Sequence, residues 1–167
     1  MNQLINRLVD DFPQFTFKFG QNFHWSPVQQ QISYNSGALK SSKGIWALFH
    51  ELGHATLGHK SYKYDFELLA IEIAAWQKAL ELAKKYGQKI SQDHVQDCLD
   101  SYREWLHCRS TCPACLNRSV QQNSGEYSCF NCHNVWQVSA SRFCRPYRKT
   151  KFTDPELLVR RNQTFFV

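Results

Sequence analysis

The sequence predicts an α+β protein in which a body of helices with a short sheet is followed by a smaller module. Apolar residues recur at helical spacing over three segments, 44–57, 65–86 and 92–106. Residues 15–19 alternate instead between apolar and polar side chains, which is typical of a half-buried strand. Most of the seven cysteines follow residue 107, where the long helical patterns end. The chain therefore changes in composition at that point.

The N-terminal part of the body supplies the expected sheet. A short helix over residues 2–10 ends before Pro13, and the strand at 15–19 ends at Gly20. A second strand is expected at 31–35, and its alternating polar residues favour a place at the edge of the sheet. An edge strand just before the first long helix could pair with an extended peptide.

Capping residues mark the ends of the three long helices. Gly58 is expected to end the first helix, and Gly87 follows the second. Asp65 is a candidate N-cap of the second helix, and Ser91 is one of the third. The second helix is apolar nearly all round in its first half, which indicates a buried, central position.

Charge is distributed unevenly along the chain. Residues 1–106 carry eleven basic and eleven acidic side chains, whereas residues 107–167 carry nine basic and three acidic ones. The whole net charge of +6 therefore lies in the second part. We expect a body over 1–106, a cysteine module over 107–144 and a basic tail over 145–167. A basic end favours an acidic partner, nucleic acid first, although it can also serve solubility alone.

Length and composition exclude several classes of protein. The 167 residues, 43% hydrophobic and 20% charged, suit a folded domain rather than a disordered or collagen-like chain. No apolar run approaches 18 residues, so we expect neither a membrane-spanning helix nor a membrane partner. The first seven residues do not resemble a secretory signal, and we therefore expect a cytoplasmic protein.

The first long helix contains the sequence HELGH at residues 50–54. His50 and His54 are four residues apart and project from one face of a helix, so both imidazoles can bind one metal ion. Glu51 can reach a metal-bound water and take its proton as general base. The motif follows the apolar segment 45–49, which provides the buried helix that this chemistry needs. The alternative is two ordinary histidines on a helix.

A catalytic zinc ion needs a third protein ligand, and Glu72 is the strongest candidate. Glu72 lies on the core-facing side of the second long helix, where an unpaired carboxylate would be costly. Glu67 and Asp65 lie in the first helical turn, where capping and the helix dipole explain acidic residues. His59 would face away from His50 if the helix continued, so we expect it at the helix end or on the substrate side.

The residues around this motif resemble a gluzincin-type zinc metallopeptidase. The resemblance rests on residues 48–54 and 72–76 and covers about residues 30–85. Within that group the chain is similar to small ImmA/IrrE-like peptidases. It is less similar to SprT-like proteases, which pair the motif with a C-terminal zinc ribbon, because no well-placed third histidine follows.

This resemblance implies a zincin-like fold for the body and a ligand set for one catalytic zinc ion. The implied ligands are His50, His54 and Glu72, with Glu51 as the base. Trp76 stands where many gluzincins have a carboxylate or amide that orients a ligand histidine, so that role has no predicted residue. The residue that stabilises the oxyanion also stays open, with four candidates: Tyr34, His59, Tyr62 and Tyr64.

Two C-x-x-C pairs, separated by 13 residues, predict a second, structural zinc site. Its four ligands would be Cys112, Cys115, Cys129 and Cys132. Strands are expected at 126–128 and 134–138, so the segment would form a zinc ribbon. A redox-active C-x-x-C would not need a second pair at this spacing. The remaining cysteines and nearby histidines are expected to bind no metal: Cys98, Cys108, Cys144, His107 and His133.

Basic residues and aromatic residues alternate after the ribbon. The candidates for contacts with nucleic acid are Arg142, Arg145, Arg148 and Lys149. Basic side chains beside aromatic rings suit a single strand, through phosphate contacts and base stacking. The same residues would also suit an acidic protein partner or packing against the body.

These observations together predict an intracellular zinc-dependent endopeptidase that carries two zinc ions, one catalytic and one structural. Its substrate would be a protein or peptide, and the basic end would direct it to proteins associated with nucleic acid. The alternative is a zinc-ribbon module that binds nucleic acid or protein, attached to an inactive zincin scaffold.

Overall fold

The computed structural model describes residues 2–139 and 148–151, and within these residues the chain is an α+β protein. The predicted α+β class is therefore confirmed. Four α-helices are described: α1 (Asn2–Asp11), α2 (Ser42–Thr56), α3 (Asp65–Lys85) and α4 (Gln92–Ser110). A 3-10 turn, η1 (Ala38–Lys40), precedes α2. None of the helices in this part of the chain has the length and apolar character needed to cross a membrane.

The chain divides into two compact units, Met1–Asp100 and Ser101–Val167. Each unit holds one small sheet. The strands of the first are β1 (Thr16–Phe19), β2 (His24–Ser26) and β3 (Gln31–Tyr34). The strands of the second are β4 (Val120–Gln121), β5 (Tyr127–Ser128), β6 (Val135–Val138) and β7 (Arg148–Lys151).

The strand expected at the edge of the first sheet is its central strand. The order is β1-β3-β2, with β3 parallel to β1 and antiparallel to β2. The sequence pattern does not predict β2, which takes the edge position. Because β3 is paired on both sides, it cannot receive an extended peptide, and that expectation is wrong.

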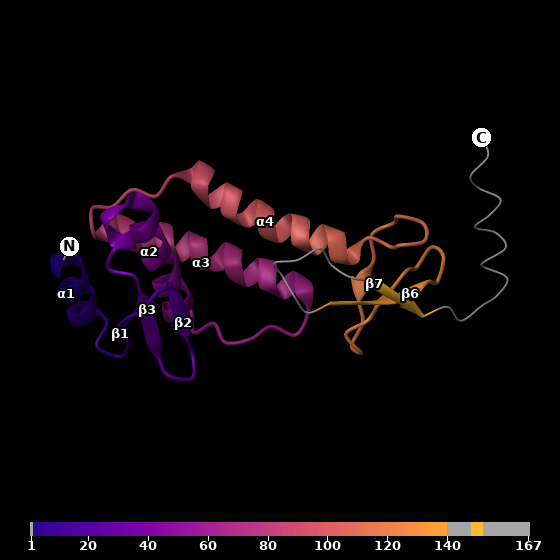
Figure 1. Ribbon diagram of the computed structural model, residues 1–167, viewed down its shortest axis with the longest axis horizontal. Coiled ribbons are helices and arrows are strands. Elements are labelled where there is room, and N and C mark those ends of the chain that lie inside the picture. Colours follow the sequence, from indigo (N-terminus) through magenta and orange to yellow (C-terminus); the bar gives the residue numbers. More distant parts are fainter. Residues whose placement is uncertain (1, 140–147, 152–167) are drawn as a thin grey trace. The chain divides into compact units, whose positions relative to one another are not determined.

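Helix α2 is the centre of the first unit (Figure 1), since it contacts β2 and β3 as well as α3. Its apolar face supplies the fully buried side chains Leu48, Phe49 and Leu52. Ser41 caps the helix, and its hydroxyl accepts a hydrogen bond from the Gly44 N–H at 3.2 Å. The motif histidines therefore lie on a helix that is packed from two directions.

Glycine at position 53 lets α3 approach α2 closely. A Cβ atom at this position would lie 2.4 Å from the carbonyl oxygen of Ala75. No side chain fits at that distance, so only glycine allows the two helix backbones to come this near. Ala75 lies one turn after Glu72 on α3, and the close approach brings Glu72 towards the histidines of α2.

Candidate metal centres

The three predicted ligands of the first site lie together between α2 and α3. The Nε2 atoms of His50 and His54 are 3.1 Å apart. Glu72 Oε2 lies 3.1 Å from His50 Nε2, and Glu72 Oε1 lies 3.7 Å from His54 Nε2. One ligand atom from each residue falls within 4.8 Å of the others, and Glu72 is buried, with 7% of its surface exposed.

These distances fit a tetrahedral zinc ion. Zn–N and Zn–O bonds of about 2.0–2.1 Å place neighbouring ligand atoms about 3.3 Å apart, close to the separations between His50, His54 and Glu72. Two imidazoles and one carboxylate are also a donor set that zinc accepts. The other ring nitrogen of His50, Nδ1, is not among these converging atoms and has no hydrogen-bond partner among the described residues.

Glu72 is held in its charged form by the two histidines. Burial by itself would raise the pKa of Glu72, but the hydrogen bonds and charges of His50 and His54 outweigh it and hold the pKa well below its ordinary value. A carboxylate that is both buried and ionised is the form that binds a cation. The other two acidic candidates lie at the start of α3. Glu67 Oε2 accepts the N–H groups of Lys63 and Tyr64. Asp65 is the first residue of the helix and Tyr64 is its N-cap, so the expectation that Asp65 caps the helix is wrong.

The carboxylate of Glu51 is anchored by the edge strand of the sheet. The backbone N–H of Trp25, in β2, donates to Glu51 Oε2 at 2.8 Å. No sequence pattern indicates this contact, because Trp25 lies 26 residues earlier and in a segment without a strand pattern. The predicted general base therefore has one oxygen held by main chain, and its orientation is fixed.

His59 contacts His54 although it is not a ligand of the group. The two Nδ1 atoms are 2.9 Å apart. The Trp25 indole N–H donates to the carbonyl oxygen of His59 at 2.8 Å. The expectation that His59 lies at the helix end is confirmed, since α2 ends at Thr56. Burial and the neighbouring His54 lower the pKa of His59, which favours a neutral ring there.

Trp76, the residue four after Glu72 for which no orienting role is predicted, lies against the ligand group. Its ring stacks on the imidazole of His50, with 4.3 Å between the centroids and 26° between the planes. His50 is therefore oriented by an aromatic surface, whereas His54 is oriented by a hydrogen-bonding partner. Among the other aromatic candidates, Tyr62 is 44% exposed and Tyr64 stacks on Phe66.

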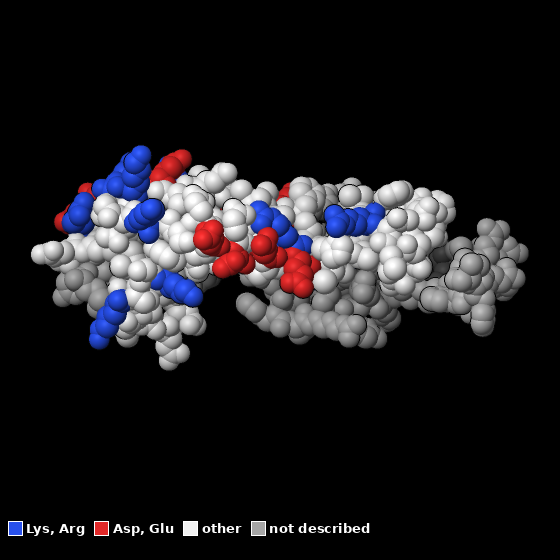
Figure 2. All heavy atoms as spheres, turned by 90° about the horizontal axis from the view of Figure 1, so that it is seen from above, with Lys and Arg blue, Asp and Glu red and all other residues white. Residues whose placement is uncertain are grey.

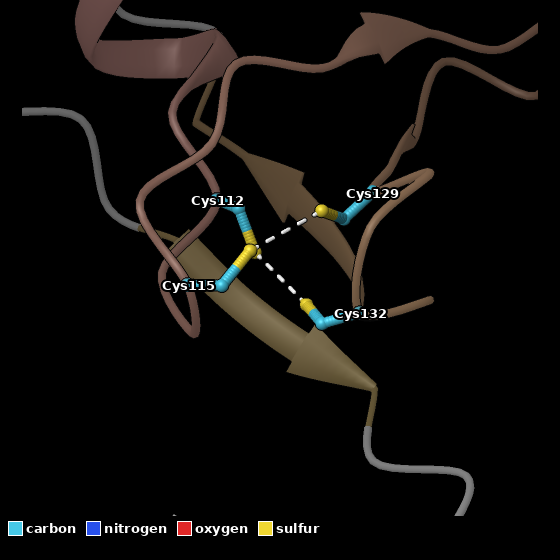
Figure 3. A group of neighbouring side chains, drawn as sticks. All are labelled: Cys112, Cys115, Cys129 and Cys132. Atoms are coloured by element: carbon cyan, nitrogen blue, oxygen red, sulfur yellow. Dashed lines mark hydrogen bonds between the residues drawn. The ribbon is translucent and has the colours of Figure 1, made fainter. Parts of the chain in front are cut away.

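The four predicted cysteines of the second unit also lie together (Figure 3). Cys112 and Cys132 have their Sγ atoms 3.6 Å apart, and Cys115 and Cys129 have theirs 3.5 Å apart. All four sulfurs fall within 4.8 Å of one another, and none is in a disulfide. A tetrahedral zinc ion with Zn–S bonds of about 2.3 Å would place them about 3.8 Å apart. The cluster is compatible with a zinc ribbon.

Two thiols of this cluster, those of Cys132 and Cys115, have pKa values shifted in opposite directions. Burial raises the pKa of Cys132 to about 12. At Cys115 burial acts in the same direction, but hydrogen bonds from Asn117 and its other neighbours outweigh it and lower the pKa to about 6. Four thiolates this close repel one another, so full deprotonation requires a bound cation.

The predicted nucleic-acid contacts are only partly described. Arg142 and Arg145 lie outside the described residues, as do Cys144 and the end of the predicted tail. Arg148 and Lys149 belong to β7, which pairs with β6 and forms one edge of the second sheet. The predicted basic tail therefore includes a strand of this sheet.

Figure 2 shows that the face viewed there carries both acidic and basic side chains among its described residues.

Comparisons with known proteins give no match: no family model, no curated protein and no solved structure is significantly similar to the chain.

Proposed function

We propose that the first unit is a zinc-dependent peptidase with a zincin-like architecture. The observation that carries this proposal is the meeting of His50, His54 and Glu72, with Glu51 following His50 directly in the sequence. Three protein ligands, rather than the four of a structural site, leave one coordination position for water or substrate. The resemblance of the HELGH helix and of residues 72–76 to gluzincins supports the same assignment.

The residues of the chain can each perform a step of peptide hydrolysis. A bound zinc ion would act as a Lewis acid towards water and the peptide carbonyl. Glu51 accepts the proton of the attacking water and passes it to the leaving amine. Trp25 holds Glu51 Oε2 through its backbone N–H, and we assign the proton transfer to the other oxygen, Oε1. Glu72 and the two histidines would hold the metal.

The test combines metal analysis with hydrolysis of an unfolded protein substrate. We expect about two zinc ions per chain in the native protein and in Glu51→Gln, and about one in Glu72→Ala. Glu51→Gln should lose cleavage by at least about 100-fold, because the general base is removed while the ligands stay. Cleavage that survives this substitution would contradict the mechanism. One zinc ion in all three proteins would show that only the cysteine cluster binds metal.

Nucleic-acid binding by the second unit is the second candidate function. The observation that favours it is the placement of the whole net charge of +6 after residue 106, with the basic strand β7 at a sheet edge. Both functions can coexist in a peptidase that acts on nucleic-acid-associated proteins inside the cell.

A further inference from the structure

We infer that His59 is a positioning residue, which fixes the tautomer and the ring orientation of the ligand His54. This inference rests on the metal site of the proposed function. His59 is not one of the three residues whose ligand atoms converge, and it acts through its contact with His54. The neighbour of a ligand histidine is usually a carboxylate, a backbone carbonyl or water, and here it is a second imidazole.

The end of α2 places His59 beside His54. Leu57 caps the helix and Gly58 follows in the left-handed region, with φ +65°. The Gly58 N–H donates to the Ala55 carbonyl at 3.1 Å, and the His59 N–H donates to the His54 carbonyl at 3.0 Å. This pair of bonds is a Schellman motif, which reverses the chain just after the helix. The reversal explains why His59 reaches the motif although a continued helix would turn it away.

A second contact holds His59 from the side of the sheet. Trp25 is buried, with 6% of its surface exposed, and its indole N–H donates to the carbonyl oxygen of His59. The backbone N–H of the same residue donates to Glu51. One residue of β2 therefore fixes both the base and the loop that carries His59. The position of His59 is set by bonds to its own backbone N–H and carbonyl oxygen, independently of its ring.

The hydrogen bond between the two rings requires one donor and one acceptor. His54 Nε2 faces Glu72 and His50, and a metal ion would bind at this atom, so in the metal-bound protein the proton of His54 must lie on Nδ1. His54 Nδ1 then donates to His59 Nδ1 at 2.9 Å. The ring proton of His59 must consequently lie on its Nε2. A partner that accepts from Nδ1 raises the basicity of the ligand nitrogen and holds the ring in the plane required for binding.

Metal affinity tests this role without reference to catalysis. His59→Leu removes the acceptor, whereas His59→Asn keeps an acceptor oxygen near the position of Nδ1. We expect the first substitution to lower zinc affinity at the histidine site by about 10–100-fold, and the second to restore most of it. His107→Leu, at an exposed position on α4, is the matched control and should change nothing. Zinc at the cysteine cluster reports on the second unit alone, so an unchanged Tm of the first unit is the measurement that shows each His59 variant to be folded.

A spectroscopic measurement complements the titration. Long-range ¹⁵N–¹H correlation of the zinc-loaded protein should show His54 with its proton on Nδ1 and His59 with its proton on Nε2. Equal zinc affinity in the native protein and in His59→Leu, or a proton on Nδ1 of His59, would overturn the inference while leaving the peptidase proposal intact. Zinc at the cysteine cluster alone in the native protein would overturn the metal site itself, and this inference with it.

Discussion

A single glycine decides how near α3 can come to the ligand histidines. Gly53 lies inside the HELGH sequence, and its missing side chain leaves room for the carbonyl oxygen of Ala75. The pattern of the motif predicts the metal ligands but gives no reason for glycine at this position. The reason is in the tertiary structure, because it depends on the backbone of a second helix.

We expect Gly53→Ala to destabilise the first unit and to weaken zinc binding at the histidine site. The added Cβ would clash with the Ala75 carbonyl, and relief of such overpacking typically costs about 1–3 kcal/mol. Thermal unfolding should show a decrease of about 4–8 °C in Tm for each kcal/mol lost in a unit of this size. Gly20→Ala is the control, since its Cβ would meet Ser33 at an ordinary 3.5 Å. Equal Tm values for the two variants would contradict the close-approach argument.

Individual residues also show which parts of the site can be predicted from sequence. His50, Glu51 and His54 lie within one helical turn, and Glu72 is a carboxylate on a core-facing stripe, so local periodicity is enough to find them. Trp25 and His59 cannot be assigned their roles in this way. Their contacts depend on a strand of three residues and on a chain reversal after Gly58, and neither has a period that a sequence pattern reveals.

Short strands account for most of the differences between the expected and the observed elements. The periodicity predicts the helices nearly to their ends, although α4 continues to Ser110, beyond the expected end at residue 106. It does not predict β2 and β7, because they have three and four residues and no clear alternation of apolar side chains. Because the sequence pattern does not reveal β2, the alternating polar residues of β3 suggest an edge strand, although β3 is the central one.

Strand β7 provides the element on which nucleic-acid binding can be tested. We expect neutralisation of this strand to weaken the binding of a single-stranded oligonucleotide and to make its salt dependence shallower. The log–log slope should change by about 0.7 for each phosphate that the strand no longer neutralises. The substitutions are Arg148→Gln, Lys149→Gln and Lys151→Gln. The control removes the same charge from exposed residues of the first unit, with Lys84→Gln, Lys85→Gln and Lys89→Gln. Equal losses of affinity in the two triple variants would indicate binding by net charge alone.

The two units differ in what stabilises them. The first has a large buried cluster drawn from α1, the sheet and all three long helices. The buried cluster of the second contains only Cys112, Tyr127, Cys129 and Trp136 among its described residues, and two of these are candidate metal ligands. A core this small contributes little free energy of folding, so the cysteine site must supply much of it.

Removal of metal should therefore affect the units unequally. We expect dialysis against a strong chelator to unfold the second unit and to leave the first unit folded, with its histidine site empty. In ¹⁵N–¹H spectra the amide resonances of residues 111–138 should lose dispersion, whereas those of residues 2–90 should keep it. Adding zinc should restore the spectrum. Dispersed resonances from both units in the metal-free protein would show that the cysteine cluster is not required for folding.

The order of strands in the first sheet also constrains how this protein can form during synthesis. β1 and β2 leave the ribosome before β3, but each pairs only with β3. No ladder of the sheet can therefore form until residues of β3 have emerged. The β2–β3 hairpin should close first, because only four residues separate its strands, and the parallel β1–β3 pairing should follow. Trp25, whose N–H is the donor for Glu51, is thus translated together with its pairing strand before the motif helix is complete.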